Sequence, residues 1–203
     1  MPSLRDTTLG TYLDDVSSSA PTPGGGGVAA LVGALAAALG AMVTEIAACA
    51  NAHASFEAWT SSCLSHRDHL LQLCVDDERA FGEVMACLKL PKDDPARALQ
   101  LQRSLQSAAD VPLETAQECL AALHTLEPMA SEATKHSVSD VGVAAHLALA
   151  AIRASALTVE VNRVAMADEQ AARDLAVAVE RIEAEAATLC RRIVDHVFAR
   201  IRG

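Results

Sequence analysis

The chain has 203 residues, of which 51% are hydrophobic but only 2% are aromatic. Its 26 acidic residues outnumber its 16 basic residues, giving a formal net charge of −10, which argues against nucleic acid and anionic membrane surfaces as partners. A core with so few rings must be built from Ala, Leu and Val, and the frequent Ala, Leu, Glu and Arg favour helix. We therefore expect an all-α protein, a single-domain multihelical bundle with long antiparallel helices that spans residues 1–203.

Hydrophobic periodicity, interrupted by proline and glycine, predicts six helices. They cover residues Thr7–Val16, Gly25–Ala50, Ser55–Leu88, Pro95–Leu126, Ser139–Val164 and Glu169–Arg202. Asp94 is the expected N-cap of the fourth helix, with Pro95 in its first turn. Pro112 falls inside that helix, where we expect a kink. The stretch from Pro128 to Val138 has the least regular pattern.

The second predicted helix carries no charge between Val28 and Val43. Uncharged apolar runs of about this length can span a membrane, but Ala and Gly make up much of this one. A helix that is apolar on all sides is also expected at the centre of a bundle or at a subunit interface. Its small residues recur at helical spacing, on one line Ala30, Ala34 and Ala38 and on another Gly33 and Gly40. The pattern therefore predicts a buried central helix with close neighbours and no membrane contact.

The run PTPGGGG, Pro21–Gly27, directly precedes this helix. It lacks the Gly-Lys-Ser/Thr ending of a phosphate-binding loop. It also follows Ser17–Ala20, which has no strand character, whereas the dinucleotide-binding fingerprint must leave a strand. Both nucleotide-binding explanations are therefore excluded.

The six cysteines are widely scattered and form no C-x-x-C pair, so we predict neither a metal site nor a disulfide framework. The N-terminus lacks the basic-then-apolar layout of a signal peptide. We therefore expect reduced, mostly buried thiols in a cytoplasmic protein.

Asp77 interrupts an apolar stripe on the third predicted helix. The stripe has helical spacing and consists of Leu70, Cys74, Phe81, Val84 and Leu88. A carboxylate held against apolar surface has its charged form disfavoured, which raises its pKa and suits it to general acid or base catalysis. A buried Asp that pairs with an Arg, or that caps a neighbouring helix, would give the same pattern. Periodicity alone favours neither the catalytic nor the structural interpretation of Asp77.

The segment SVSDVG, residues 137–142, contains Ser139 and Asp140. Taken alone, Ser139 is expected to cap the fifth helix and Asp140 to lie in its first turn, where the helix dipole favours a negative charge. His136 directly precedes the segment and is either a proton donor or a solvated loop histidine.

Asn162 shares a face of the fifth predicted helix with Asp140. At about 1.5 Å rise per residue the two side chains are about 33 Å apart, so they cannot serve one site in one subunit. Two such helices running antiparallel across a twofold axis would bring Asp140 of one chain to Asn162 of the other. We therefore predict a homodimer with sites shared across its interface.

Three segments match a known family in order: SSSAPTPGGGGVAALVGALAAALGAMV, DDERAFGEVMACLKLPK and SDVGVAAHLALAAIRASALTVEVN. They resemble the cyclodeaminase/cyclohydrolase family, which includes the cyclodeaminase domain of formiminotransferase-cyclodeaminase and free-standing methenyltetrahydrofolate cyclohydrolases. The resemblance covers most of the chain. It implies an all-helical dimer that acts on one-carbon units of tetrahydrofolate, as formimidoyltetrahydrofolate cyclodeaminase or 5,10-methenyltetrahydrofolate cyclohydrolase, with a tetrahydrofolate derivative as substrate and no prosthetic group.

The resemblance also implies roles for individual residues. Asp77 matches the acidic position of the family's D-x-x-A-F motif and is the expected general acid/base, with Asp140 and His136 as further catalytic candidates. The substrate-binding candidates are Pro23, Gly24, Gly25, Gly26, Lys92, Ser139 and Asn162. Glycines without side chains would let the flat pterin lie against the backbone, although a tight turn for helix packing would also need them. Lys92 would meet the carboxylates of folate.

Two segments depart from the family pattern. Residues 47–59 lack the Lys- and Tyr-containing stretch that is common after the second helix. Ala133 and Thr134 stand where the family usually has Gly-Asn, and His136 stands where a further asparagine is often found. These departures motivate a second hypothesis, a catalytically silent helical dimer that binds a folate-like ligand or a partner protein.

Overall fold

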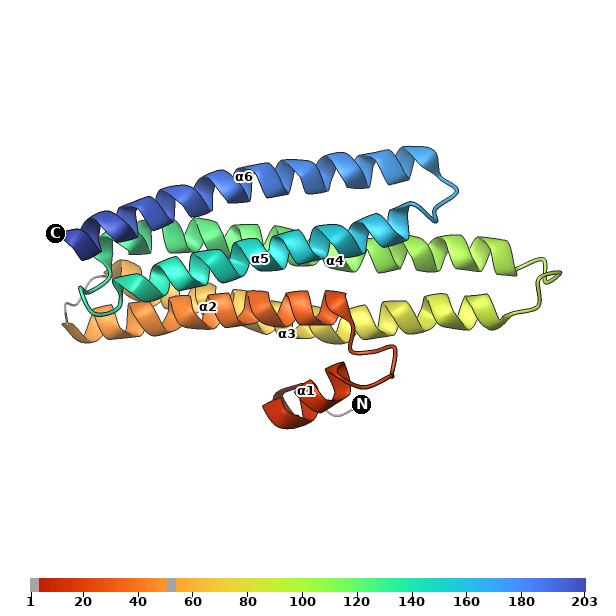
Figure 1. Ribbon diagram of the computed structural model, residues 1–203, viewed down its shortest axis with the longest axis horizontal. Coiled ribbons are helices and arrows are strands. Elements are labelled where there is room, and N and C mark those ends of the chain that lie inside the picture. Colours follow the sequence, from red (N-terminus) through yellow and green to blue (C-terminus); the bar gives the residue numbers. More distant parts are fainter. Residues whose placement is uncertain (1–3, 51–53) are drawn as a thin grey trace.

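The computed structural model describes residues 4–50 and 54–203, and these residues form an all-α single domain (Figure 1). A short 3-10 helix, Leu4–Asp6, precedes six α-helices. Their bounds are α1 Leu9–Val16, α2 Gly25–Ala50, α3 Ala54–Lys89, α4 Arg97–Glu132, α5 Val138–Arg163 and α6 Glu169–Arg202. The predicted all-α fold is confirmed. Residues 51–53 of the departing segment 47–59 lie outside the described residues.

The five long helices lie side by side in one elongated bundle, and α1 lies to one side of it (Figure 1). Each long helix runs antiparallel to the next and packs against it. In addition α2 packs against α5, and α4 packs against α6. Because α4 also contacts α2, the helices α2, α4 and α5 each pack against at least three others and together form the interior of the bundle.

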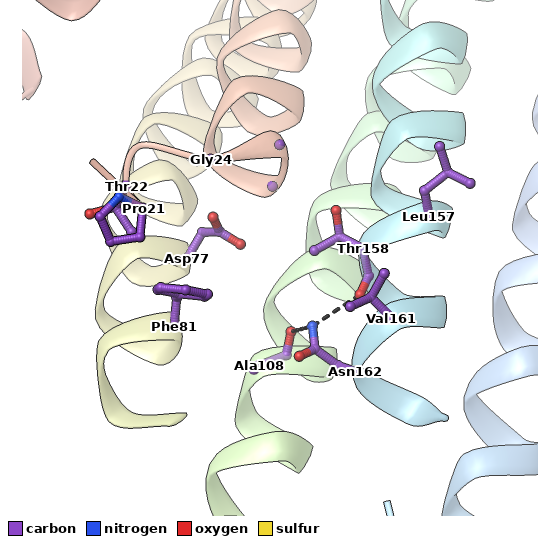
Figure 2. Close-up of a pocket in the computed structure, with 12 residues that line it drawn as sticks. Pro21, Thr22, Gly24, Asp77, Phe81, Ala108, Leu157, Thr158, Val161 and Asn162 are labelled. Atoms are coloured by element: carbon purple, nitrogen blue, oxygen red, sulfur yellow. Dashed lines mark hydrogen bonds between the residues drawn. The ribbon is translucent and has the colours of Figure 1, made fainter. Parts of the chain in front are cut away.

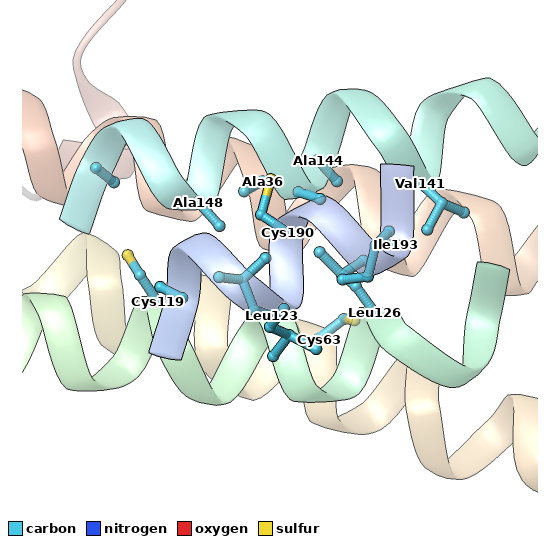
Figure 3. Packing of buried hydrophobic residues seen from close by; sticks show 14 of the residues in the cluster. Ala36, Cys63, Cys119, Leu123, Leu126, Val141, Ala144, Ala148, Cys190 and Ile193 are labelled. Carbon is cyan, nitrogen blue, oxygen red and sulfur yellow. The ribbon is translucent and has the colours of Figure 1, made fainter. Parts of the chain in front are cut away.

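The central helices pack closely because their inward residues are small. A Cβ at Gly33 would lie 2.5 Å from the sulfur of Cys119, and one at Gly40 would lie 2.8 Å from the sulfur of Cys63. These distances are far below ordinary contact, so neither position can carry a side chain without displacing a neighbour. Figure 3 shows alanines of α2 and α5 among Leu, Ile and Cys side chains of the core. The predicted close packing of the second helix is confirmed.

Two helices, α2 and α5, are long and apolar enough to cross a membrane by length and composition alone. Within the bundle, however, other parts of the protein bury 61% of the most apolar 18-residue stretch of α2. For the corresponding stretch of α5 the buried share is 44%. Core helices of globular proteins have the same composition. The packing of α2 and α5 therefore accounts for their apolar character.

All six cysteines are free, and all except Cys49 are buried. Burial raises the pKa of the Cys63 thiol to about 12. Such thiols stay protonated and act as small apolar side chains of the core. The prediction of unpaired, mostly buried cysteines is confirmed.

Two predicted boundaries of α4 are wrong. The helix begins at Arg97 after Ala96, which makes no side-chain cap, and Asp94 accepts the N–H of Ala96 in the preceding turn at 2.8 Å. At its other end α4 continues through Pro128 to Glu132 instead of stopping near Leu126. Proline removes one helical hydrogen bond, but the buried Met129 and Ala130 keep the last turn packed against the core.

The predicted cap of α5 is also wrong. The helix begins at Val138, so Ser139 lies inside it, and the N-cap Ser137 makes no capping bond with its side chain. The preceding loop is held by Thr134, whose hydroxyl accepts the N–H of Ser137 at 3.2 Å. The predicted bounds of α2 and α6 agree with the structure, and α3 is one residue longer at each end than predicted.

Candidate active site

A cavity of about 350 Å³ opens beside the N-terminus of α2 (Figure 2). Its volume is in the range of pockets that hold small organic ligands. Its lining comes from the glycine turn before α2 and from α2, α3, α4 and α5: Pro21, Thr22, Gly24, Gly25, Gly26, Asp77, Phe81, Ala108, Leu157, Thr158, Val161 and Asn162. The wall thus combines exposed backbone, apolar surface and a few polar side chains.

Asp77 is the one ionisable side chain among the described residues that line this cavity. Its Oδ2 accepts the N–H of Gly27 at 2.8 Å. Burial raises the pKa of the Asp77 carboxyl above its ordinary value of 3.8, and the Gly27 hydrogen bond opposes part of that rise. The nearby Arg79 pairs with Asp76 instead, at 3.0 Å. Asp77 is therefore a partly buried carboxyl aimed at a cavity.

Gly26 allows the first turn of α2 to approach this carboxyl. A Cβ on residue 26 would lie 2.0 Å from Oδ1 and 2.6 Å from Cγ of Asp77, whereas a Cβ on Gly25 would meet nothing within 4 Å. The first N–H groups of a helix have no acceptor within it, and Asp77 takes the one on Gly27. Gly25 and Gly26 themselves line the cavity.

Further acidic side chains lie near Asp77. Burial, followed by the charges of Asp77 and Asp15, raises the pKa of Glu78. Burial, followed by the nearby Cys74, Glu78 and Asp77, raises the pKa of Tyr12 to about 12. The Tyr12 hydroxyl is buried and finds no hydrogen-bond partner among the described residues. A second cavity of about 320 Å³ lies here, lined in part by Tyr12, Pro23 and Glu78.

Asn162 enters the first cavity from α5, across from Asp77 (Figure 2). Its Nδ2 donates to the carbonyl of Ala108 in α4 at 2.9 Å and to that of Thr158 in its own helix at 3.0 Å. Both amide hydrogens are therefore used. The site offers a ligand one carboxyl that can hold or give up a proton and one amide with a defined orientation.

Comparison with known proteins identifies the family. The family described as Formiminotransferase-cyclodeaminase matches residues 8–181. The chain belongs to this family. Methenyltetrahydrofolate cyclohydrolase from Methylorubrum extorquens is 36% identical over 202 residues, which cover 96% of this chain and 97% of that protein.

Longer members and a solved structure extend the comparison. Formimidoyltransferase-cyclodeaminase from Mus musculus is 30% identical over 82% of this chain but only 32% of its own length. The chain thus corresponds to about a third of that protein. The crystal structure of formiminotetrahydrofolate cyclodeaminase from Thermotoga maritima superposes with a TM-score of 0.88 and 27% identity, over 96% of this chain and 98% of that one. This folate cyclodeaminase/methenyltetrahydrofolate cyclohydrolase family is a family of enzymes, as the sequence resemblance predicts.

The cyclodeaminase fold brings five of the predicted site residues together. Gly24, Gly25 and Gly26 line the same cavity as Asp77 and Asn162. The predicted separation along α5 places Asp140 at the opposite end of that helix from Asn162, about 33 Å away. Ser139 lies beside Asp140 in the first turn of α5, and His136 lies in the loop before it.

Two predicted binding residues do not line this cavity. Pro23 lines the neighbouring cavity instead, together with Thr22, which contributes to both. Lys92 lies in the connection between α3 and α4, beyond Lys89. The end of α3 is about 18 Å from Asp77 along the helix axis.

Several lining residues escaped the sequence analysis. Phe81 follows Asp77 by one helical turn and could have been recognised from the D-x-x-A-F spacing. Leu157 and Val161 are 71% and 70% exposed apolar residues one turn apart on α5. Their hydrophobicity alone predicts core positions, so only the structure identifies them as an exposed rim of the cavity.

Proposed function

We propose that this protein is a 5,10-methenyltetrahydrofolate cyclohydrolase. The observation that carries the proposal is the partly buried Asp77 carboxyl, which has a raised pKa and is held at the cavity wall by the Gly27 N–H. The likeness to the Methylorubrum extorquens cyclohydrolase, which extends over nearly the full length of both chains, supports this activity. The substrate is a tetrahydrofolate derivative, and the reaction proposed needs no prosthetic group.

Asp77 acts as the general base in this proposal. Water adds to the methenyl carbon, and the water proton passes to the Asp77 carboxylate. The remaining hydroxyl proton is lost as one carbon–nitrogen bond of the bridge breaks, and the released nitrogen takes up a proton. A formyl group is left on the other nitrogen, and one proton is released overall. A carboxylate whose pKa lies nearer neutrality is a better base for such a step than an ordinary one. The acid side of the pH profile of kcat/KM should therefore have its midpoint above 3.8.

The glycine turn and α3 provide the binding surface. The pterin lies against the backbone of Gly24–Gly26 and beside Pro23, while Asn162 bonds one of its polar groups. The remainder of the substrate runs along α3, so that its carboxylates reach Lys92. This single positive group would offset the unfavourable net charge of the protein locally.

Formimidoyltetrahydrofolate cyclodeaminase is the second candidate. The fold agreement with the Thermotoga maritima cyclodeaminase favours it. In that reaction N10 attacks the formimino carbon on N5, and ammonia leaves with a proton from an acid. The raised pKa of Asp77 also allows it to supply that proton.

A homodimer completes the site in this proposal. Leu157 and Val161 border the cavity and are highly exposed in the single chain. A second copy packed antiparallel on α5 would cover this apolar rim and bring the partner's Asp140 toward Asn162. The partner's Ser139 and His136 would follow, with His136 as a further proton donor. We place this dimer in the cytoplasm, where reducing conditions keep free thiols unpaired.

A paired absorbance assay tests the proposed function. Loss of the methenyltetrahydrofolate absorbance on addition of enzyme identifies hydrolysis, and appearance of that absorbance from formiminotetrahydrofolate identifies cyclodeamination. Asp77→Asn should lower kcat/KM by about 10²- to 10⁴-fold. Asp76→Asn is the matched control, because Asp76 pairs with Arg79 outside the cavity, and it should retain activity. A parent protein that converts neither substrate would instead support the catalytically silent alternative.

A further inference from the structure

Pro112 leaves one backbone carbonyl of α4, next to the candidate site, without its helical N–H donor. It lies buried in the middle of α4, and proline has no N–H to give to the carbonyl four residues earlier. That carbonyl belongs to Ala108, which is only 6% exposed and lines the cavity. A buried carbonyl without a donor is costly. Pro112 therefore leaves an acceptor in α4 that must be satisfied from another element.

Asn162 supplies the missing donor. Its Nδ2 lies 2.9 Å from the Ala108 oxygen and 3.0 Å from the Thr158 oxygen (Figure 2). Both partners are carbonyls, which can only accept, so the NH2 group of the amide must face them. The amide oxygen is then turned away from both carbonyls and remains available as an acceptor in the cavity. The orientation of the amide follows from these two contacts.

We infer that Pro112 is a positioning residue for the reaction, because the carbonyl it frees fixes the Asn162 amide with its oxygen directed to the substrate. This inference rests on the proposed function. It also specifies the chemistry that Asn162 recognises, which is an N–H or O–H donor of the bound folate. Without Pro112, the Ala108 carbonyl would receive its own helical N–H, and Asn162 would lose the contact that holds it across from Asp77.

A double-mutant cycle separates this role from a general effect on α4. Pro112→Ala gives residue 112 an N–H that can bond to Ala108. We expect it to lower kcat/KM by about 2- to 10-fold, mainly through KM, since one neutral hydrogen bond is weakened. Asn162→Ala should cause at least as large a loss. In the Asn162→Ala background, Pro112→Ala should have no further effect.

Pro128→Ala is the matched control. Pro128 lies in the same helix, about 24 Å away along its axis, and is exposed and outside the cavity lining. It should retain the parental kcat/KM. The inference is overturned if Pro112→Ala leaves kcat/KM unchanged, or if it causes the same loss with and without Asn162.

Nuclear magnetic resonance of the Asn162 side-chain amide provides a readout that does not depend on turnover. Its signals are assigned by their absence in Asn162→Ala. They should exchange slowly with solvent in the parent and at least several-fold faster in Pro112→Ala. Equal exchange in the two proteins would contradict the positioning role. If the parent converts neither folate, the proposed function fails, and the amide exchange still decides whether Pro112 orients Asn162.

Discussion

At the scale of single residues, two opposing effects set the proton affinity of Asp77. Burial disfavours the charged carboxylate, while the Gly27 N–H stabilises it. The net effect is a pKa above 3.8 in the folded protein. The folded state therefore binds a proton more tightly than the unfolded chain does. Stability is consequently lost as pH rises from 3.8 through the raised pKa, and at neutral pH the charge of Asp77 destabilises the fold.

Asp77→Asn should therefore remove the activity without lowering the stability of the fold. The amide oxygen of Asn can still accept the Gly27 N–H, and the buried charge is gone. We expect the free energy of unfolding at neutral pH to be unchanged or higher, while the activity is lost. The difference from the parent should vanish below pH 3.8, where both side chains are neutral. Urea denaturation at both pH values measures this, and a clear loss of stability at neutral pH would show that the carboxylate has a stabilising partner.

The sequence patterns indicate Asp77 and Asn162 as separate candidates but do not place them in one cavity. Asp77 interrupts an apolar stripe, and Asn162 shares a face with other α5 residues, so each is visible from helical spacing. Periodicity gives the faces of a helix but not the identity of its neighbours. The contact of Asn162 with Ala108 depends in addition on Pro112 in a third helix. The sequence indicates only a kink there.

At the scale of elements, the first turn of α2 and the middle of α3 fit together through one glycine. Gly26 lies where a side chain would overlap the Asp77 carboxyl, and the next residue donates the N–H that holds it. Gly25 has open space at the same turn. Within the glycine run, residue 26 therefore has no room for a side chain, whereas residue 25 has. The sequence alone does not distinguish these two positions.

Gly26→Ala and Gly25→Ala form a matched pair that tests this difference. The new Cβ at residue 26 must displace Asp77 and break its bond to Gly27, which should lower the free energy of unfolding by about 1 kcal/mol. Alanine at residue 25 should be neutral or stabilising by about 0.4–1 kcal/mol, because it restricts the unfolded chain. Urea denaturation of both variants measures the two changes. Equal losses of stability would contradict the contact between Gly26 and Asp77.

The long elements themselves were largely predictable. The bounds of α2 and α6 agree with the sequence analysis because turn residues mark their starts and their patterns are continuous. The end of α4 was not predictable from Pro128, since tertiary contacts of Met129 and Ala130 compensate for the lost helical bond. Local sequence rules apply to an isolated helix, whereas tertiary contacts within the bundle determine where α4 ends.

At the scale of the whole molecule, the sequence identifies the family and the fold, and the structure adds one half of the proposed site. The cavity holds Asp77 and Asn162 from the same chain, while Asp140 lies about 33 Å from Asn162 along α5. If Asp140 takes part in catalysis, it must come from a second copy. The exposed Leu157 and Val161 mark the surface on which that copy would pack.

Heterodimers of two inactive variants test the shared site. Asp77→Asn and Asp140→Asn chains, each carrying its own affinity tag, are co-expressed and purified through both tags. One site of the heterodimer then contains both substitutions, and the other contains neither. We therefore expect about half of the parental activity per dimer, although each homodimer is inactive.

The control heterodimer combines Asp77→Asn with Asn162→Ala. These two residues line one cavity of the same chain, so each site of that heterodimer carries one substitution, and its activity should stay at or below the level of the Asn162→Ala homodimer. Light scattering checks that all species are dimers. An inactive Asp77/Asp140 heterodimer, an active Asp140→Asn homodimer or a monomeric parent would each contradict the shared site. Complementation confined to the Asp77/Asp140 pair would require Asp140 to act across the interface, because no bending of one 26-residue helix could bring its two ends together.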